Sequence, residues 1–354
     1  MRLKPLARLY FPTRSVRFGL SVFVIPMKSR RIPADQFQIK KLKKIYNRKQ
    51  VNSFNYKICY NKKKELLLKI EKVNTKNALK LLKTRSYILE KLKNSGLPII
   101  LIKSIQNKKK YFIHDRKLFS FYEFSDGNHF SGTSNEIQKI SKTTVKLINV
   151  LSNITAQNPK YLNKYKKIKY FSYEEDKLLK KLHKNKKNWK KIFKKNFSIV
   201  KTNWNMILNL RNEAKSANIN KGNYQLCHID LHPHNFIFKK GTPIAILDFA
   251  SLCGNYSGYA LAFALLKQSR QCFTLKKNRH NMKKTMSSYI REINSIYKTK
   301  PFTRLDLYFL SISEVLRRIM IIFKFLLISK DRSWEHVLSI QIKHLKEAQK
   351  IFEI

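Results

Sequence analysis

The first regular pattern of apolar and polar positions along the chain is typical of a β-hairpin followed by a helix. Strand-like runs at 56–60 and 66–70 flank a short polar turn, which predicts two paired strands. Residues 77–94 then carry apolar side chains at helical spacing, and Gly96 and Pro98 follow directly. Because glycine and proline commonly end helices, we expect the helix to stop there.

Shorter apolar runs follow this helix. They predict three further strands, at 99–102, 111–114 and 118–124. The remainder of the chain has mostly helical periodicity, apart from a hairpin pattern near residue 240. A sheet-rich front and a helical back predict an α+β fold with two lobes and a cleft between them.

We place the lobe boundaries by these changes in pattern. An N-terminal lobe with an antiparallel sheet is expected over 33–125, and a larger, mainly helical C-terminal lobe over 126–354. Residues 1–32 form a basic leader, because they prefer Arg to Lys and no acidic residue precedes Asp35. We expect a disordered extension, with Met27 as the true start; an organelle transit peptide is the alternative.

The charge balance is the most unusual feature of the composition. The chain has 75 Lys and Arg against 21 Asp and Glu, a net charge of +54, which attracts polyanions. Lysines occur in every segment, so compositional drift is the favoured explanation over a basic binding tail. Residues 160–201 interleave lysines with aromatic side chains, a pattern that also suits single-stranded nucleic acid. We expect a helix with a solvated face there and no nucleic-acid partner.

Cysteine usage and hydropathy bear on the compartment. The four cysteines form no C-x-x-C pair and no metal-like spacing, which predicts a reduced, cytoplasmic protein. We expect no transmembrane segment, because the most apolar stretch, 319–328, is interrupted by Lys324 and preceded by Arg317 and Arg318. That stretch is predicted to be a buried helix.

The candidate chemistry lies in 228–249. Two apolar strands are joined by a turn that contains Gly241 and Pro243, and folding the hairpin there sets Asn235 opposite Asp248. An amide oxygen and a carboxylate suit Mg²⁺, whose remaining ligands are waters and nucleotide phosphates. Asp230 lies on the loop that leads into this end, where it can orient and deprotonate an attacking hydroxyl.

Two alternatives compete for the same loop. His228, Asp230, His232 and His234 alternate, so on one strand they would face the same way, as the ligands of a zinc or iron hydrolase do. Pro233 argues against an uninterrupted strand. A polar loop without chemistry is the other alternative, but such polar density among apolar residues is costly unless it is used.

The pattern H-x-D-x-x-x-x-N, a short hairpin and then D-F resembles the aminoglycoside phosphotransferase and choline kinase superfamily, which is related to protein kinases. The resemblance implies a two-lobed protein-kinase-like fold and a phosphotransferase that uses ATP and Mg²⁺ on a hydroxyl of a small molecule. It implies that Asp230 is the catalytic base, that Asn235 and Asp248 hold Mg²⁺, and that His228 supports the loop.

The front half agrees with this resemblance, which covers about residues 45–270. Lys69 lies in a strand-like run similar to the one whose lysine binds nucleotide phosphates, and 119–127 resembles the hinge that carries adenine. The N-terminal lobe is therefore expected to bind nucleotide.

Weaker features indicate which branch of the superfamily the chain resembles. Residues 52–58 and 255–259 resemble choline and ethanolamine kinases, which favours an amino alcohol as acceptor. However, Ala250 and Ala260 replace two acids that help to build a site for a cationic substrate. A homoserine kinase-like or other small-molecule kinase is an alternative. A polycationic aminoglycoside is disfavoured, because a protein of this net charge repels it.

A non-catalytic nucleotide-binding member is the rival from another class. The nucleotide loop lacks glycine, and Arg85 stands where the resemblance expects the glutamate partner of Lys69, with Glu90 as a stand-in. Asp230, Asn235 and Asp248 count against this alternative, because a binding module does not need all three.

Overall fold

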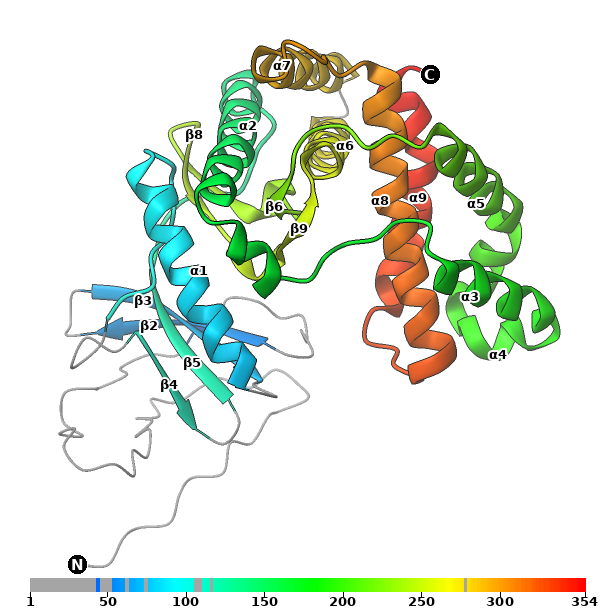
Figure 1. Cartoon of the computed structure of the whole chain (residues 1–354), viewed down its shortest axis with the longest axis horizontal. Coiled ribbons are helices and arrows are strands. Elements are labelled where there is room, and N and C mark those ends of the chain that lie inside the picture. The colour runs from blue at the N-terminus through cyan, green and yellow to red at the C-terminus, as the bar shows by residue number, and fades with distance from the viewer. Residues whose placement is uncertain are drawn as a thin grey trace, which may run out of the picture. The chain divides into compact units, whose positions relative to one another are not determined.

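The computed structural model of the chain describes residues 43–44, 53–60, 64–72, 76–104, 110–114, 117–276 and 279–354. They divide into two compact units (Figure 1). The first unit contains the strands β1 to β5, and the second comprises Val73–Ile102 and Ser125–Ile354. The predicted leader 1–32 lies outside the described residues, and the predicted lobe boundaries stay a prediction.

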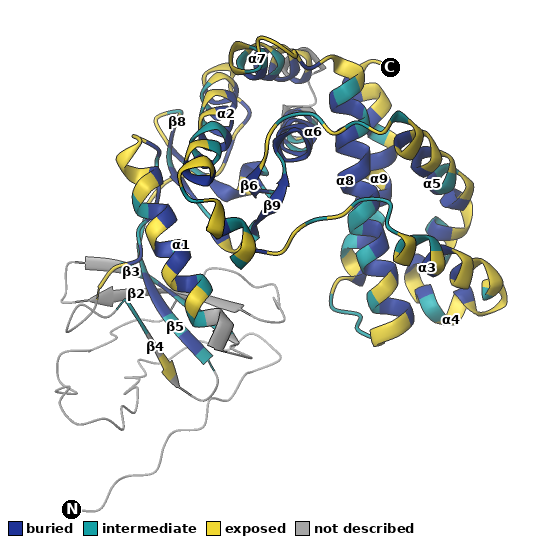
Figure 2. Cartoon of the chain, in the orientation of Figure 1, coloured by how far each residue is buried: buried dark blue, intermediate teal, exposed yellow. Residues whose placement is uncertain are grey.

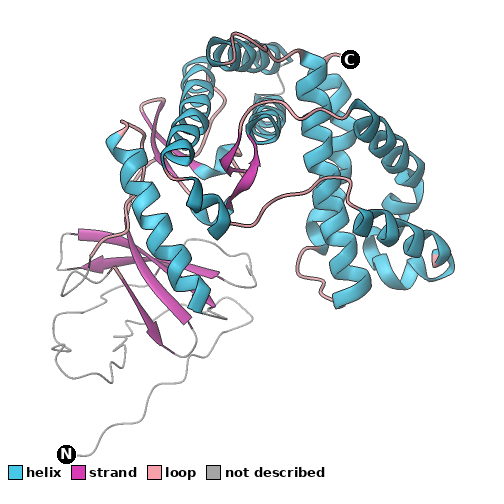
Figure 3. Ribbon diagram, in the orientation of Figure 1, coloured by secondary structure: helices cyan, strands magenta, loops and turns pink. Residues whose placement is uncertain are grey.

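The first unit is an antiparallel sheet with the strand order β1-β2-β3-β5-β4 (Figure 3). Its strands are β1 (Lys43–Lys44), β2 (Ser53–Tyr60), β3 (Lys64–Lys72), β4 (Tyr111–His114) and β5 (Lys117–Glu123). The pairing of β2 with β3 confirms the predicted hairpin. Leu68 on β3 lies opposite Phe121 on β5, and both side chains are buried.

The second unit is mainly helical, as predicted. Its helices are α1 (Lys76–Asn94), α2 (Ser134–Gln157), α3 (Tyr173–Lys184), α4 (Trp189–Phe193), α5 (Phe197–Ala217), α6 (Ser257–Lys276), α7 (Arg279–Ile296), α8 (Arg304–Lys324) and α9 (Glu335–Phe352). Two short strand pairs lie among them, β6 (Tyr224–His228) with β9 (Leu252–Tyr256) and β7 (Phe236–Lys239) with β8 (Thr242–Ile246).

Helix α6 forms the centre of this unit. All residues from 259 to 266 are buried, so the helix is apolar around its whole circumference (Figure 2). Helices α2, α7, α8 and α9 pack around it. A helix surrounded in this way has a fixed position, and the strand pair β6–β9 packs against it.

Helix α8 confirms the buried helix predicted near 319–328. Its start is fixed by a capping box, in which the Thr303 hydroxyl accepts from the Asp306 N–H and the Asp306 carboxylate accepts from the Thr303 N–H. Ile319 and Phe323 are fully buried. Among the helices in the described part of the chain, none combines the length and apolar character needed to cross a bilayer.

Two predictions of local structure need correction. Residues 99–102 form no strand, because Ile99 makes one isolated bridge to Ile246 and the Lys103 N–H already donates to Phe121 O, 2.8 Å away. The segment is too short to build a ladder between these bonds. Residues 160–201 are several short helices and turns, and the burial of Trp189 and Phe193 explains the interleaved aromatic residues as core.

Candidate active site

Two strand pairs position the predicted catalytic loop. Strand β6 ends at His228, opposite Leu252 of β9. The chain then passes through a short loop and the 3₁₀ turn Pro233–Asn235 into β7. The loop is therefore held at one end by a buried strand and at the other by the β7–β8 hairpin.

His228 ties this loop to the end of β8. Its ring is fully buried, with Nε2 3.0 Å from Leu247 O and Nδ1 3.2 Å from the Asp230 N–H. Burial lowers the pKa of His228, despite the nearby carboxylates, so the ring is neutral at physiological pH. One neutral tautomer satisfies both bonds, because Nε2–H donates to the carbonyl and Nδ1 accepts from the amide.

Asp230 is half-buried, and its carboxylate contacts the side chains of Arg318 and His232. Its Oδ1 lies 3.2 Å from Nη1 of Arg318, and its Oδ2 lies 3.5 Å from Nε2 of His232. Burial acts to raise the pKa of Asp230, but the charge of Arg318 and the hydrogen bond from His232 lower it well below its usual value. The carboxylate is therefore ionised at physiological pH.

Arg318 on α8 joins the loop to the helical core, a role that the sequence analysis did not assign. Besides Asp230, it donates from Nη2 to Ile229 O at 2.9 Å and from Nε to Glu314 Oε1 at 2.8 Å. Its guanidinium lies over the Phe263 ring, 4.2 Å from the centroid. These bonds fix the head of Arg318 on the loop side of α8.

Glu314 anchors this arrangement from within α8. Its carboxylate is buried and accepts from Arg317 at 2.6 and 2.7 Å, from Arg318, and from the Tyr170 hydroxyl at 2.9 Å. Burial opposes ionisation, but both arginines lower the pKa of Glu314. The signal in the sequence was an E-x-x-R-R pattern inside an apolar helix, since charges at i, i+3 and i+4 meet on one face.

Asn235 and Asp248 lie at the open end of the β7–β8 hairpin. The Leu247 N–H donates to Asn235 O at 2.8 Å, so Asn235 lies opposite Leu247, one position from the predicted partner. The pairing of Lys239 with Thr242 alone would set Asn235 opposite Ile246, and the shift between Ile237 and Phe238 moves it one residue closer to Asp248. Asp248 follows in a left-handed conformation, with φ 59°. Its carboxylate is exposed, as a metal ligand at the edge of a site requires.

The donor atoms at this end fit a magnesium ion. Nδ2 of Asn235 donates to Asp230 O at 2.6 Å, which leaves Oδ1 as the atom that can face a cation. Together with the Asp248 carboxylate it offers the hard oxygen ligands that Mg²⁺ prefers. In the described ranges no group of three or more His, Cys, Asp or Glu residues is arranged to hold a metal, so the zinc or iron hydrolase lacks a ligand set there.

Helix α6 also holds the catalytic loop, through a contact that the sequence analysis did not predict. Nε2 of Gln268 donates to Leu231 O at 3.0 Å, and Oε1 of Gln268 accepts from the Tyr289 hydroxyl at 2.6 Å. All of these atoms belong to buried residues. The loop backbone is thus bonded to α6 through Gln268 and to α8 through Arg318.

Lys69 lies in the first unit, on β3, as predicted. It is opposite Asn55 on β2 and Ser120 on β5, and its Nζ lies 3.4 Å from Glu71 Oε1. Residues two apart on a strand share a face, which explains this contact. Binding of nucleotide phosphates by Lys69, and of adenine by 119–127, stays a prediction.

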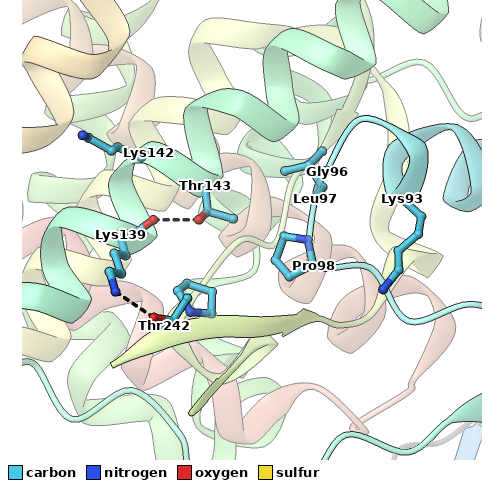
Figure 4. Close-up of a pocket in the computed structure, with 9 residues that line it drawn as sticks. Lys93, Gly96, Leu97, Pro98, Lys139, Lys142, Thr143 and Thr242 are labelled. Atoms are coloured by element: carbon cyan, nitrogen blue, oxygen red, sulfur yellow. Dashed lines mark hydrogen bonds between the residues drawn. The ribbon is translucent and has the colours of Figure 1, made fainter. Parts of the chain in front are cut away.

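A pocket of about 490 Å³ is formed by other segments than the catalytic loop (Figure 4). It is lined by Lys93, Gly96, Leu97, Pro98, Lys139, Lys142, Thr143, Thr242 and Pro243. Nζ of Lys139 donates to the Thr242 hydroxyl at 2.7 Å, which closes part of its wall. The lining contains none of the predicted site residues.

Comparison with known proteins identifies the fold. No protein-family model matches the chain, and no curated protein matches it. Among solved structures, spectinomycin phosphotransferase in complex with ADP and spectinomycin is 15% identical, with 89% of this chain and 93% of that chain covered and a TM-score of 0.63. Amicoumacin kinase in complex with AMP-PNP and Ca²⁺ is 14% identical, with 89% and 90% covered and a TM-score of 0.58.

An ethanolamine kinase of Plasmodium vivax is similar as well. It is 16% identical, with 88% of this chain and 82% of that chain covered and a TM-score of 0.51. These similarities extend over most of the chain, which agrees with the arrangement of a sheet unit and a helical unit. The chain has the protein-kinase-like fold shared by aminoglycoside phosphotransferases, amicoumacin kinase and ethanolamine kinase.

Proposed function

We propose that this protein transfers the terminal phosphoryl group of ATP to a hydroxyl of a small molecule. The observation that carries the proposal is the convergence of Asp230, Asn235 and Asp248 on one loop and one hairpin end, held there by His228. Complexes of similar structures with ADP and AMP-PNP support a nucleotide as the phosphoryl donor.

The chain's own groups supply positioning and one proton acceptor. The ionised Asp230 carboxylate accepts the proton of the attacking hydroxyl and orients its lone pair towards the phosphorus. Asn235 and Asp248 hold the magnesium ion, which neutralises phosphate charge when bound. Lys69 is proposed to bind the nucleotide phosphates.

Replacement of the base tests this mechanism. Asp230→Asn keeps the size and one acceptor but cannot take up a proton, so we expect phosphoryl transfer to fall by about 10²- to 10⁴-fold. Calorimetric titration is expected to show nearly unchanged affinity for magnesium-ATP, because Asp230 contacts the acceptor and not the metal. Asp331→Asn, in the loop after α8, is the matched control. Transfer at the parental rate by Asp230→Asn would contradict the proposal.

Replacement of the proposed metal ligand is expected to affect nucleotide binding, in contrast to replacement of the base. We expect Asp248→Ala to abolish magnesium-dependent binding of ATP and to leave the melting temperature within a few degrees of the parent, because the carboxylate is exposed. Unchanged affinity for magnesium-ATP would remove Asp248 from the site. A parent that binds nucleotide but phosphorylates no member of a metabolite panel would favour the non-catalytic alternative.

The chemical identity of the phosphoryl acceptor is the more specific part of the proposal. Sequence similarity at 255–259 favours an amino alcohol, with a homoserine kinase-like activity as the alternative. Asn255 is buried and donates from Nδ2 to the Tyr170 hydroxyl at 2.9 Å, and the Tyr170 ring stacks on Tyr259 at 3.8 Å. The Tyr170 hydroxyl of this pair donates to Glu314, which also binds Arg318, the partner of Asp230.

A further inference from the structure

Helix α6 contains a cation that the mechanism so far does not use. Lys267 is the first charged residue of the helix and follows directly on the fully buried residues 259–266. The side chain leaves a core helix and is itself half-buried. An ammonium group in such a place is costly unless an anion accompanies it.

No protein carboxylate in the described part of the chain forms an ion pair with it. Within the described part of the chain, no acidic side chain lies within ion-pair distance of Lys267, and its nearest polar contact is Nε2 of His344 at 3.5 Å. His344 is buried, and burial together with the charge of Lys267 lowers its pKa to about 2, so it stays neutral. Burial likewise lowers the pKa of Lys267 to about 8, although the Asp230 carboxylate acts to raise it.

The ammonium group lies near the catalytic loop, because the Asp230 carboxylate acts on its pKa. Nζ of Lys267 lies over the Phe263 ring, 5.9 Å from the centroid, and the guanidinium of Arg318 lies over the same ring. Arg318 in turn contacts Asp230. One aromatic ring therefore brings Lys267 close to the proposed base.

The neighbouring cations already have partners. Arg270 forms an ion pair with Glu347, and Arg318 is bonded to Glu314 and Asp230. Of these three cations, Lys267 alone has no carboxylate of the described residues within ion-pair distance, and the Asp230 carboxylate acts on it only at longer range. The observation points to a negative charge that arrives with a ligand.

We propose that Lys267 binds an anionic group of the phosphoryl acceptor, a carboxylate or a phosphate, while the acceptor's hydroxyl lies at Asp230. The inference rests on the proposed kinase function, but it favours anionic hydroxy compounds, such as hydroxy acids and hydroxylated amino acids, over the amino alcohol indicated by sequence similarity. Choline and ethanolamine carry only positive charge, which Lys267 and Arg318 repel.

The reaction itself is unchanged by this refinement. The acceptor oxygen forms a bond to the terminal phosphorus of ATP, the bond from that phosphorus to the bridging oxygen breaks, and ADP leaves with that electron pair. The hydroxyl proton passes to Asp230. Lys267 remains bound to the anionic group throughout and takes no part in the bond changes.

A labelling experiment tests the site without any turnover. An amine-reactive reagent modifies the neutral form of lysine, and peptide mass spectrometry reads Lys267 and the exposed Lys346 of α9 in the same sample. We expect inorganic phosphate and acetate to slow modification of Lys267 several-fold and to leave Lys346 unchanged, because a bound anion raises the Lys267 pKa and shields its Nζ. Modification of Lys267 that is insensitive to both anions would overturn the inference.

A turnover experiment separates this inference from the proposed function. The full chain with magnesium-ATP is offered glycerate, homoserine, glycerol 3-phosphate, glycerol, ethanolamine and choline, and phosphorylated products are identified by mass spectrometry. We expect products from the anionic compounds, and at least a tenfold higher KM in Lys267→Met but not in Lys346→Met. Phosphorylation of ethanolamine or choline alone would overturn the inference while supporting the kinase. No product and no ATP hydrolysis would count against the kinase itself, and the labelling result would still decide the anion site.

Discussion

At the scale of single residues, the ionisation of Asp230 depends on Arg318. The guanidinium lies 3.2 Å from the carboxylate and is fixed by Glu314 and Ile229 O, so it acts as a permanent charge beside the proposed base. An aspartate held in this way stays ionised far into the acid range. Arg318 is thus a positioning residue that also sets a protonation state.

A pH profile tests this role. In Arg318→Met the pKa of Asp230 rises, because burial is no longer opposed by the guanidinium, so the base is protonated at higher pH. We expect the acid limb of the kcat/KM profile to move upward in pH relative to the parent. Arg318→Lys retains a positive charge and is expected to move it less. An acid limb at the parental pH in Arg318→Met would mean that Arg318 has only a structural role.

The stability of the fold gives a second prediction at this scale. Lys267 has a folded pKa of about 8 against its ordinary value of 10.5, so the unfolded chain binds more protons between these values and stability rises with pH across that window. Lys267→Met removes the cost of burying the charge. We expect a gain of about 1–3 kcal/mol at pH 7 in urea unfolding, since one pKa unit is about 1.4 kcal/mol.

The gain in Lys267→Met should shrink to near zero at pH 10.5, where the lysine is neutral in the folded state and half neutral in the unfolded state. Lys346→Met, which removes an exposed charge, is expected to change stability little at either pH. An equal gain at pH 7 and pH 10.5 would show that packing, and not charge burial, accounts for the effect.

At the scale of secondary-structure elements, the hairpin β7–β8 is held by a close backbone contact. The Asn128 N–H donates to Phe238 O at 2.8 Å, and the Phe238 N–H donates to Asn128 O at 2.7 Å. Gly127 permits this approach, because a Cβ atom there would lie 2.5 Å from Phe238 O. The hairpin carries Asn235 at its end, so this bridge helps to position the metal site.

Substitution of this glycine measures the contact. In Gly127→Ala the new methyl group meets backbone, which cannot rotate away, so we expect a loss of about 1–3 kcal/mol in urea unfolding. Asn128→Ala changes an exposed side chain of the same bridge and is expected to have little effect. Equal stability of Gly127→Ala and the parent would show that the bridge yields without cost.

The sequence predicted those elements whose signals lie within a few neighbouring residues. The β2–β3 hairpin, α1 and the β7–β8 hairpin follow from runs, periodicity and turn residues within a few positions. The pair β6–β9 was missed, because its strands are more than twenty residues apart in sequence and short. Arg318 and Gln268 were missed for the same reason, since only the packing of α8 and α6 brings them to the loop.

At the scale of the whole molecule, the excess of positive charge is spread along the sequence. The predicted α+β arrangement agrees with the fold of the solved structures. The net charge of +54, in contrast, is not explained by the geometry of the catalytic loop. Compositional drift predicts that attraction to polyanions is spread over the surface. A dedicated nucleic-acid site predicts that it is concentrated on the exposed lysines of α3 and α4.

Two matched variants distinguish these explanations. One replaces four exposed lysines of α3, α4 and the turn between them with glutamine, Lys180, Lys184, Lys187 and Lys191. The other replaces four exposed lysines elsewhere, Lys142, Lys298, Lys346 and Lys350. Binding of single-stranded RNA is measured as a function of salt, where each phosphate contact contributes about 0.7 to the slope of log K against log salt.

We expect both variants to lower the affinity and the slope equally, because a diffuse field loses the same charge in each case. A loss confined to the first variant would instead identify α3 and α4 as a nucleic-acid-binding surface and overturn the drift explanation.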